Sequence, residues 1–211
     1  MEAKDYRLLL IGSSYVKRLQ EYIHVNKGWP AFWVRGAHVD FLGQSGGRVD
    51  SVRTMVQETM ETKKGVFDMG CLVLGGNDLC MASASPEVVA KGLIDLAQTL
   101  IVEYGLKKVI ICEIIHRKTQ HSRMEIPLAE FNLKVEQLNA ILQENLKIDG
   151  NICFWLHKPD VTYDKSYHAD GTHFSSFGQG KFLSSLRRGF WCHLQQALGI
   201  VPRTIHVEKT E

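Results

Sequence analysis

Runs of apolar residues alternate along this chain with segments in which apolar residues recur every three to four positions. The runs predict β-strands, and three of them, Leu8–Ile11, Cys71–Leu74 and Val109–Cys112, are apolar at every position. Continuous runs of this kind are typical of strands covered on both faces, as in parallel sheets. The predicted strands are Tyr6–Ile11, Ala31–Leu42, Phe67–Leu74, Lys108–Ile115 and Ile152–His157.

The segments between these strands have helical periodicity. Val16, Leu19 and Ile23 form one apolar stripe, and Ser85-Pro86-Glu87 is a capping sequence for a later helix. Helices are predicted near residues 16–23, 49–60, 86–105, 127–147 and 175–198. Strands that alternate with helices predict a three-layer α/β/α sandwich with a five-stranded parallel sheet, in the flavodoxin-like order 2-1-3-4-5.

Length and composition restrict the class of protein. The 211 residues predict a single domain over 1–211, with its core at about 6–198 and a polar tail at 199–211. A hydrophobic content of 45% and a charged content of 23% are typical of globular proteins. The formal net charge of +2 and the scattered basic residues give no indication of nucleic-acid binding. No apolar run reaches the length of a membrane span, and the polar N-terminus predicts no secretory signal.

The cysteines give no indication of a disulfide framework or a zinc site. Their number, five, is odd, and no pair has CxxC spacing. Cys71, Cys112 and Cys153 lie within predicted strands, where they are expected to be small buried apolar side chains. An intracellular, cytoplasmic location is therefore expected, with no metal in the site. The sequence gives no information on the oligomeric state.

Short polar motifs follow the first three predicted strands. They are Gly12-Ser13-Ser14, Ser45-Gly46-Gly47 and Gly75-Gly76-Asn77-Asp78. In the predicted order the first three strands are neighbours, so these motifs converge on one crevice beyond the carboxyl ends of the strands. Ser14 opens a helix, where free N–H groups and the helix dipole favour developing negative charge.

Asp170 and His173 stand three residues apart, just before the last predicted helix. At this spacing the two side chains can face each other, so that Asp170 favours the imidazole tautomer that accepts the Ser14 proton. Ser14 is thus the predicted nucleophile, His173 the general base and Asp170 the orienting acid. The backbone N–H groups of Ser14 and Gly46 and the side-chain amide of Asn77 are the predicted oxyanion donors. These residues predict a serine esterase.

From Tyr6 to Leu198 the chain resembles the SGNH (GDSL-type) hydrolases. Ser14 matches the family's nucleophile, Gly46 and Asn77 match its oxyanion residues, and Asp170 with His173 matches its DxxH pair. The resemblance implies esterase or lipase-like acyl hydrolysis without a cofactor, on a small-molecule or lipid-like ester. One position departs from the pattern, because the family's Gly-Asp-Ser reads Gly12-Ser13-Ser14 here.

Two alternatives stay open at this point. Gly43-Gln44-Ser45-Gly46-Gly47 fits the G-x-S-x-G pattern of a nucleophile elbow, which would make Ser45 the nucleophile and leave Asn77 unexplained. The missing acid at Ser13 also fits a binding module of the same fold with little turnover, related to domains found in retrotransposons. Tyr15, next to the predicted nucleophile, is expected either to contact substrate or to pack on its helix.

Overall fold

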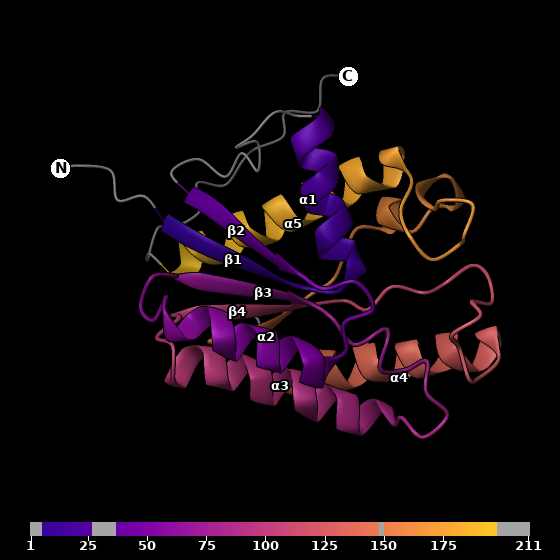
Figure 1. The fold of residues 1–211 in the computed structure, drawn as a ribbon, viewed down its shortest axis with the longest axis horizontal. Helices are drawn as coiled ribbons and strands as arrows, with labels where there is room; N and C mark the ends of the chain where they lie inside the picture. The colour runs from indigo at the N-terminus through magenta and orange to yellow at the C-terminus, as the bar shows by residue number, and fades with distance from the viewer. Residues whose placement is uncertain (1–5, 27–36, 148–149, 198–211) are drawn as a thin grey trace, which may run out of the picture.

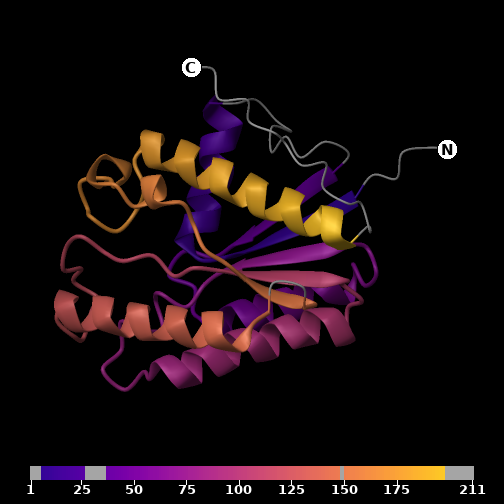
Figure 2. The same cartoon turned by 180° about the vertical axis from the view of Figure 1, so that it is seen from behind.

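The computed structural model describes residues 6–26, 37–147 and 150–197. They form a parallel sheet between two layers of helices (Figures 1 and 2). The sheet has five strands in the order β2-β1-β3-β4-β5, which confirms the predicted fold class. The strands are β1 (Tyr6–Gly12), β2 (Ala37–Gly43), β3 (Met69–Val73), β4 (Lys108–Cys112) and β5 (Ile152–Trp155).

The helices divide between the two faces of the sheet (Figure 1). One face is covered by α1 (Ser14–Asn26) and α5 (Ser176–Ala197). The other is covered by α2 (Val49–Glu61), α3 (Pro86–Val102) and α4 (Leu128–Asn145). Short 3-10 turns at Pro159–Val161 and Asp164–Ser166 precede α5. None of the helices within the described ranges is both long and apolar enough to cross a bilayer.

Burial on both faces explains the uniformly apolar strands. Successive side chains of a strand point to opposite faces of the sheet. Leu9 and Ile11 of β1 pack under α2 and α3, whereas Leu8 and Leu10 pack under α1 and α5. All four of these side chains are almost completely buried. A polar residue at any of these positions would therefore lose its hydration, which is why the alternating pattern of a half-exposed strand is absent.

Some element ends differ from the sequence prediction. β4 ends at Cys112, before the predicted Ile115, because Asn139 of α4 accepts from the N–H of Ile114 and donates to its C=O, both at 2.8 Å. This side chain replaces the hydrogen bonds that a continuing sheet would supply. The predicted residues 31–36 of the second strand, Leu198 and the tail 199–211 lie outside the described residues.

Close backbone contacts bring the loops after β1, β2 and β3 together. The N–H of Gln44 donates to the C=O of Gly12 at 2.9 Å, and the N–H of Ser13 donates to the C=O of Val73 at 3.2 Å. A Cβ atom on Gly12 would collide with that same carbonyl of Val73, so the approach requires glycine. The three loops that carry the predicted site residues therefore meet at one edge of the sheet.

Candidate active site

Ser14 is the first residue of α1 and follows β1 after a single intervening residue. The C=O of Ser13 accepts from the N–H groups of Val16 and Lys17 at 3.1 and 3.3 Å, which starts the helix at this point. The Oγ atom of the half-buried Ser14 lies 3.0 Å from Nε2 of His173. The structure therefore brings the predicted nucleophile within hydrogen-bonding distance of the predicted base.

Asp170 holds the other side of the His173 ring. One carboxylate oxygen, Oδ2, lies 2.8 Å from Nδ1 of His173. The other, Oδ1, accepts from the backbone N–H groups of Thr172 and His173 at 2.9 and 2.8 Å. Gly171 takes a φ of 60° in this tight turn. Because one carboxylate fixes both the turn and the imidazole, the ring of His173 has a defined orientation and Nδ1 carries the proton.

The charges of this pair follow from its surroundings. Burial lowers the pKa of His173, the hydrogen bond that it donates to Asp170 raises this pKa, and the positive charges of Arg18 and Arg117 lower it. The net result is a pKa below the usual value. Burial raises the pKa of Asp170, but the hydrogen bonds from His173 and the turn hold it well below its usual range. At neutral pH His173 is therefore neutral and Asp170 ionised, the states that a base and its orienting acid require.

Gly46 and Asn77 lie on either side of Ser14, at the ends of β2 and β3. Gly46 adopts a φ of 69°, a conformation that L-residues with a side chain rarely take. The amide of Asn77 donates from Nδ2 to the C=O of Gly47 at 3.0 Å, so its second N–H is available to a ligand. Within the described part of the chain, no hydrogen bond occupies the backbone N–H of Ser14 or Gly46.

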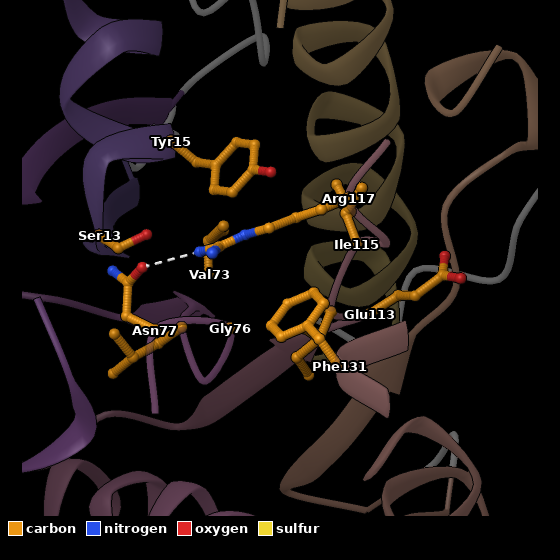
Figure 3. A pocket seen from close by; sticks show the side chains of 11 residues that line it. Ser13, Tyr15, Val73, Gly76, Asn77, Glu113, Ile115, Arg117 and Phe131 are labelled. Carbon is orange, nitrogen blue, oxygen red and sulfur yellow. Dashed lines mark hydrogen bonds between the residues drawn. The ribbon is translucent and has the colours of Figure 1, made fainter. Parts of the chain in front are cut away.

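Arg117 orients Asn77, a contact that the sequence does not indicate. Its Nη2 donates to Oδ1 of Asn77 at 3.1 Å, which identifies the opposite amide atom as the donor (Figure 3). Only 7% of Arg117 is exposed, and the guanidinium lies 4.7 Å from the ring centroid of Phe131. Nη1 donates to Sγ of Cys80 at 2.9 Å. The residue lies in an irregular segment after β4, where no sequence pattern marks it.

Asp78 joins the Asn77 loop to the start of α2. Its carboxylate accepts from the N–H of Val49 at 3.1 and 3.3 Å, a favourable position for an acid at a helix N-terminus. Burial raises the pKa of Asp78 to about 6. This bond fixes the loop after β3 to the segment that contains Gly46. Asp78 therefore sets the distance between the two loops rather than facing the cleft.

A cleft of about 460 Å³ opens in front of these residues. Ser14, Gly46, Asn77 and His173 all line it. Ser45, the alternative nucleophile, also lines the cleft, but the hydrogen bond of His173 Nε2 goes to Ser14. The remaining lining residues are Tyr15, Arg18, Arg48, Cys80, Arg117, His121, Ser122, Arg123 and Thr172. Four arginines that are far apart in the sequence thus lie around one opening.

Tyr15 borders both this cleft and a smaller cavity of about 30 Å³, and Figure 3 shows the smaller cavity. The hydroxyl of Tyr15 donates to the C=O of Thr172, and its ring packs against Phe174 with centroids 5.2 Å apart. Burial raises the pKa of Tyr15 to about 12, so its hydroxyl stays protonated. Tyr15 therefore packs on the turn of Asp170 and His173, and a contact with substrate stays a prediction. Across the described residues, no three His, Cys, Asp or Glu side chains group as metal ligands.

Comparison with known proteins identifies the fold. No protein-family model matches the sequence, and no curated protein matches it. Among solved structures, a putative acylhydrolase from Bacteroides fragilis is similar with a TM-score of 0.70 and 16% identity, over 89% of this chain and 88% of that chain. Est24, a carbohydrate acetylesterase from Sinorhizobium meliloti, has a TM-score of 0.70 and 15% identity, over 89% and 99%. A GDSL-like lipase from Bacteroides thetaiotaomicron has a TM-score of 0.67 and 15% identity, over 90% and 89%. The chain has the fold of these hydrolases.

Proposed function

We propose that this protein is a serine esterase that hydrolyses a small or medium acyl ester. The observation that carries the proposal is the chain of contacts from Ser14 Oγ to His173 Nε2 at 3.0 Å and from His173 Nδ1 to Asp170 at 2.8 Å. A nucleophile, a base and an orienting acid in this order define a serine hydrolase site. The similar folds of an acylhydrolase, a lipase and a carbohydrate acetylesterase support an ester as substrate.

In the first step the hydroxyl of Ser14 attacks the ester carbonyl while Nε2 of His173 takes its proton. The charge that develops on the carbonyl oxygen is stabilised by the N–H groups of Ser14 and Gly46 and by the amide of Asn77. The ionised Asp170 stabilises the imidazolium that forms. His173 then donates the proton to the leaving alcohol, and the acyl group stays on Ser14.

In the second step water replaces the alcohol. Nε2 of His173, again neutral, takes a proton from the water as it attacks the acyl carbonyl, and the same donors bind the oxyanion. Collapse of the intermediate releases the acid and returns the proton to Ser14. The cleft of about 460 Å³ lies in the size range typical of small-molecule sites, which supports a small or medium substrate.

Hydrolysis of a short-chain 4-nitrophenyl ester by the wild type, Ser14→Ala and Ser45→Ala tests the proposal. The wild type and Ser45→Ala are expected to release 4-nitrophenol, and Ser14→Ala is expected to lose most of the turnover. Ser45→Ala is a matched control, because it removes the same hydroxyl group from the same cleft. Loss in Ser45→Ala with retention in Ser14→Ala would assign the nucleophile to the elbow and contradict the proposal.

A further inference from the structure

Arginine side chains gather in the cleft where the proposed esterase would bind its ester. Arg18, Arg117 and Arg123 line the same cleft as Ser14 and His173. Among the residues that line this cleft none is an aspartate or a glutamate. In the described part of the chain, no carboxylate forms an ion pair with any of these three arginines. The residues that line the cleft thus bring positive charge together without a lining carboxylate.

Arg18 reaches the cleft from the same helix as the nucleophile. It follows Ser14 by four residues in α1, and residues at this spacing lie on the same face of a helix. Its charge is close enough to lower the pKa of His173. The side chain is exposed, so it can approach a bound ligand without a rearrangement of the core.

Arg123 lies beside Gly46, the residue whose N–H is a predicted oxyanion donor. Its Nη1 atom is 3.6 Å from the position that a Cβ atom on Gly46 would occupy. Arg48 also lines the cleft, but its guanidinium donates to Sδ of Met81 at 2.9 Å and its charge lowers the pKa of Asp78. Arg48 is exposed as well, but this contact holds its guanidinium against Met81. Arg18 and Arg123 are the exposed cleft arginines whose guanidinium groups have no hydrogen-bond partner among the described residues.

Arg117 adds a charge that is nearly buried. A buried cation is costly unless a carboxylate or another acceptor compensates it. The acceptors of Arg117 are the neutral groups of Asn77 and Cys80. Ser13, the residue that replaces the acid of the SGNH pattern, lines the same small cavity as Arg117 (Figure 3). Glu113 also lines this cavity, but its carboxylate accepts from the N–H of His157 at 2.9 Å. At Ser13 the chain therefore has a neutral hydroxyl where an acid would supply a further negative charge.

We propose that the substrate is an anionic ester, with a carboxylate, sulfate or phosphate group near the scissile carbonyl that contacts Arg18 and Arg123. This inference rests on the proposed esterase function and specifies its substrate class. Guanidinium groups bind planar or tetrahedral oxyanions through paired hydrogen bonds. A cleft lined by charge of one sign also raises the local concentration of oppositely charged ligands.

Two pairs of esters test the proposal. Mono-4-nitrophenyl glutarate and its methyl ester differ by one charge on the acyl side, and the acetate esters of 4-hydroxybenzenesulfonate and 4-hydroxybenzenesulfonamide differ on the alcohol side. The ratio of kcat/KM within each pair is measured for the wild type, Arg18→Gln, Arg123→Gln and Arg188→Gln at about pH 8, where His173 is neutral. Arg188 is the matched control, because it is an exposed arginine of α5 that does not line the cleft.

The wild type is expected to prefer the anionic member of at least one pair. Arg18→Gln and Arg123→Gln are each expected to reduce this preference about three- to fivefold, and Arg188→Gln is expected to leave it unchanged. The preference should also weaken between about 0.01 M and 1 M salt, as the Debye length falls from about 30 Å to about 3 Å.

Different experimental results would contradict the anionic substrate alone or the esterase function as well. If hydrolysis of the neutral esters depends on Ser14 but neither pair shows a charge preference, the anionic substrate is wrong and the esterase stands. The anionic assignment would also be wrong if the preference is unchanged in Arg18→Gln and Arg123→Gln. It would be wrong too if these variants lose kcat/KM equally for both members of a pair. If no ester is hydrolysed in a Ser14-dependent manner, the esterase function fails and the inference fails with it.

Discussion

Replacement of Arg117 by methionine is expected to slow the enzyme by about tenfold, because Arg117 positions the amide of Asn77. The guanidinium donates to Oδ1 of Asn77 at 3.1 Å, which leaves Nδ2 directed at Gly47 and the cleft. A hydrogen bond from a charged donor contributes about 1.5–3 kcal/mol, and about half of this, transmitted to the transition state, gives about four- to thirteenfold in rate. Loss of an entire oxyanion donor lowers kcat by about 10²–10³-fold, which is the upper limit for the effect of Arg117→Met.

A double-mutant cycle separates positioning from other roles. The kcat and kcat/KM for 4-nitrophenyl acetate are measured for the wild type, Arg117→Met, Asn77→Ala and the double variant at about pH 8. A neutral ester removes the attraction between substrate and guanidinium. At this pH His173 is neutral in every variant. Loss of the nearby positive charge raises the pKa of His173, but it does so from a value that lies below the usual one. Arg117→Lys is the control that keeps the charge without the planar guanidinium.

If Arg117 acts through Asn77, its replacement should cost less than about twofold in the Asn77→Ala background, because there is no amide left to orient. An undiminished tenfold loss in that background would refute the positioning role. Urea unfolding of all four proteins shows whether the buried site stays folded. Arg117→Met removes two hydrogen bonds and one desolvated charge, so the expected change in unfolding free energy is about 1–2 kcal/mol.

Four further predictions concern the neighbouring residues. Because the pKa of His173 is lowered, kcat/KM for a neutral ester should fall only as pH drops below about 6.5, and a midpoint above that value would contradict His173 as the base. Asp170→Asn should reduce kcat by up to about 10⁴-fold, since the ring would lose the tautomer that accepts the Ser14 proton, whereas near-normal turnover would exclude Asp170 from the site. Gly46→Ala places a side chain at a φ of 69° beside Arg123, so it should lower the unfolding free energy by about 1–2 kcal/mol and also slow turnover. Unchanged urea unfolding would show that the backbone at this position is not strained by a side chain. Ser13→Asp should add a second carboxylate, beside Glu113, to the cavity of Arg117 and reduce the rate on anionic esters relative to neutral ones, measured as the ratio of kcat/KM.

The sequence predicts the sheet because burial on both faces leaves a direct mark on composition. Leu8–Ile11 and Val109–Cys112 are apolar at each position since both faces of β1 and β4 are covered. The order of the strands then places Ser14, Gly46 and Asn77 at one edge, and the structure brings them there. β4 and β5 end before the predicted residues, because side-chain hydrogen bonds, and not the apolar run, decide where pairing stops. Asn139 bonds the backbone of Ile114 after β4, and Glu113 accepts from the N–H of His157 after β5.

The arginines of the cleft were not predicted, for different reasons. Arg18 follows Ser14 by four residues, so helical geometry alone could have placed it beside the nucleophile. Arg117 and Arg123 lie in the irregular segment between β4 and α4, which has no periodicity. This segment is fixed by contacts with other elements. Examples are the two hydrogen bonds between the side chain of Asn132 and the backbone of Arg117, each 3.0 Å long. Information of this kind exists only in the folded chain.

Covalent labelling by a fluorophosphonate tests the central claim most directly, because the reagent reacts with an activated serine and needs no knowledge of the substrate. The labelled protein is digested and the modified peptide is mapped by mass spectrometry, with His173→Ala as the control that removes the base. The esterase account predicts one adduct, on Ser14, that His173→Ala abolishes. An adduct on Ser45, or no adduct on the folded wild type under conditions that label a known serine esterase, would contradict it.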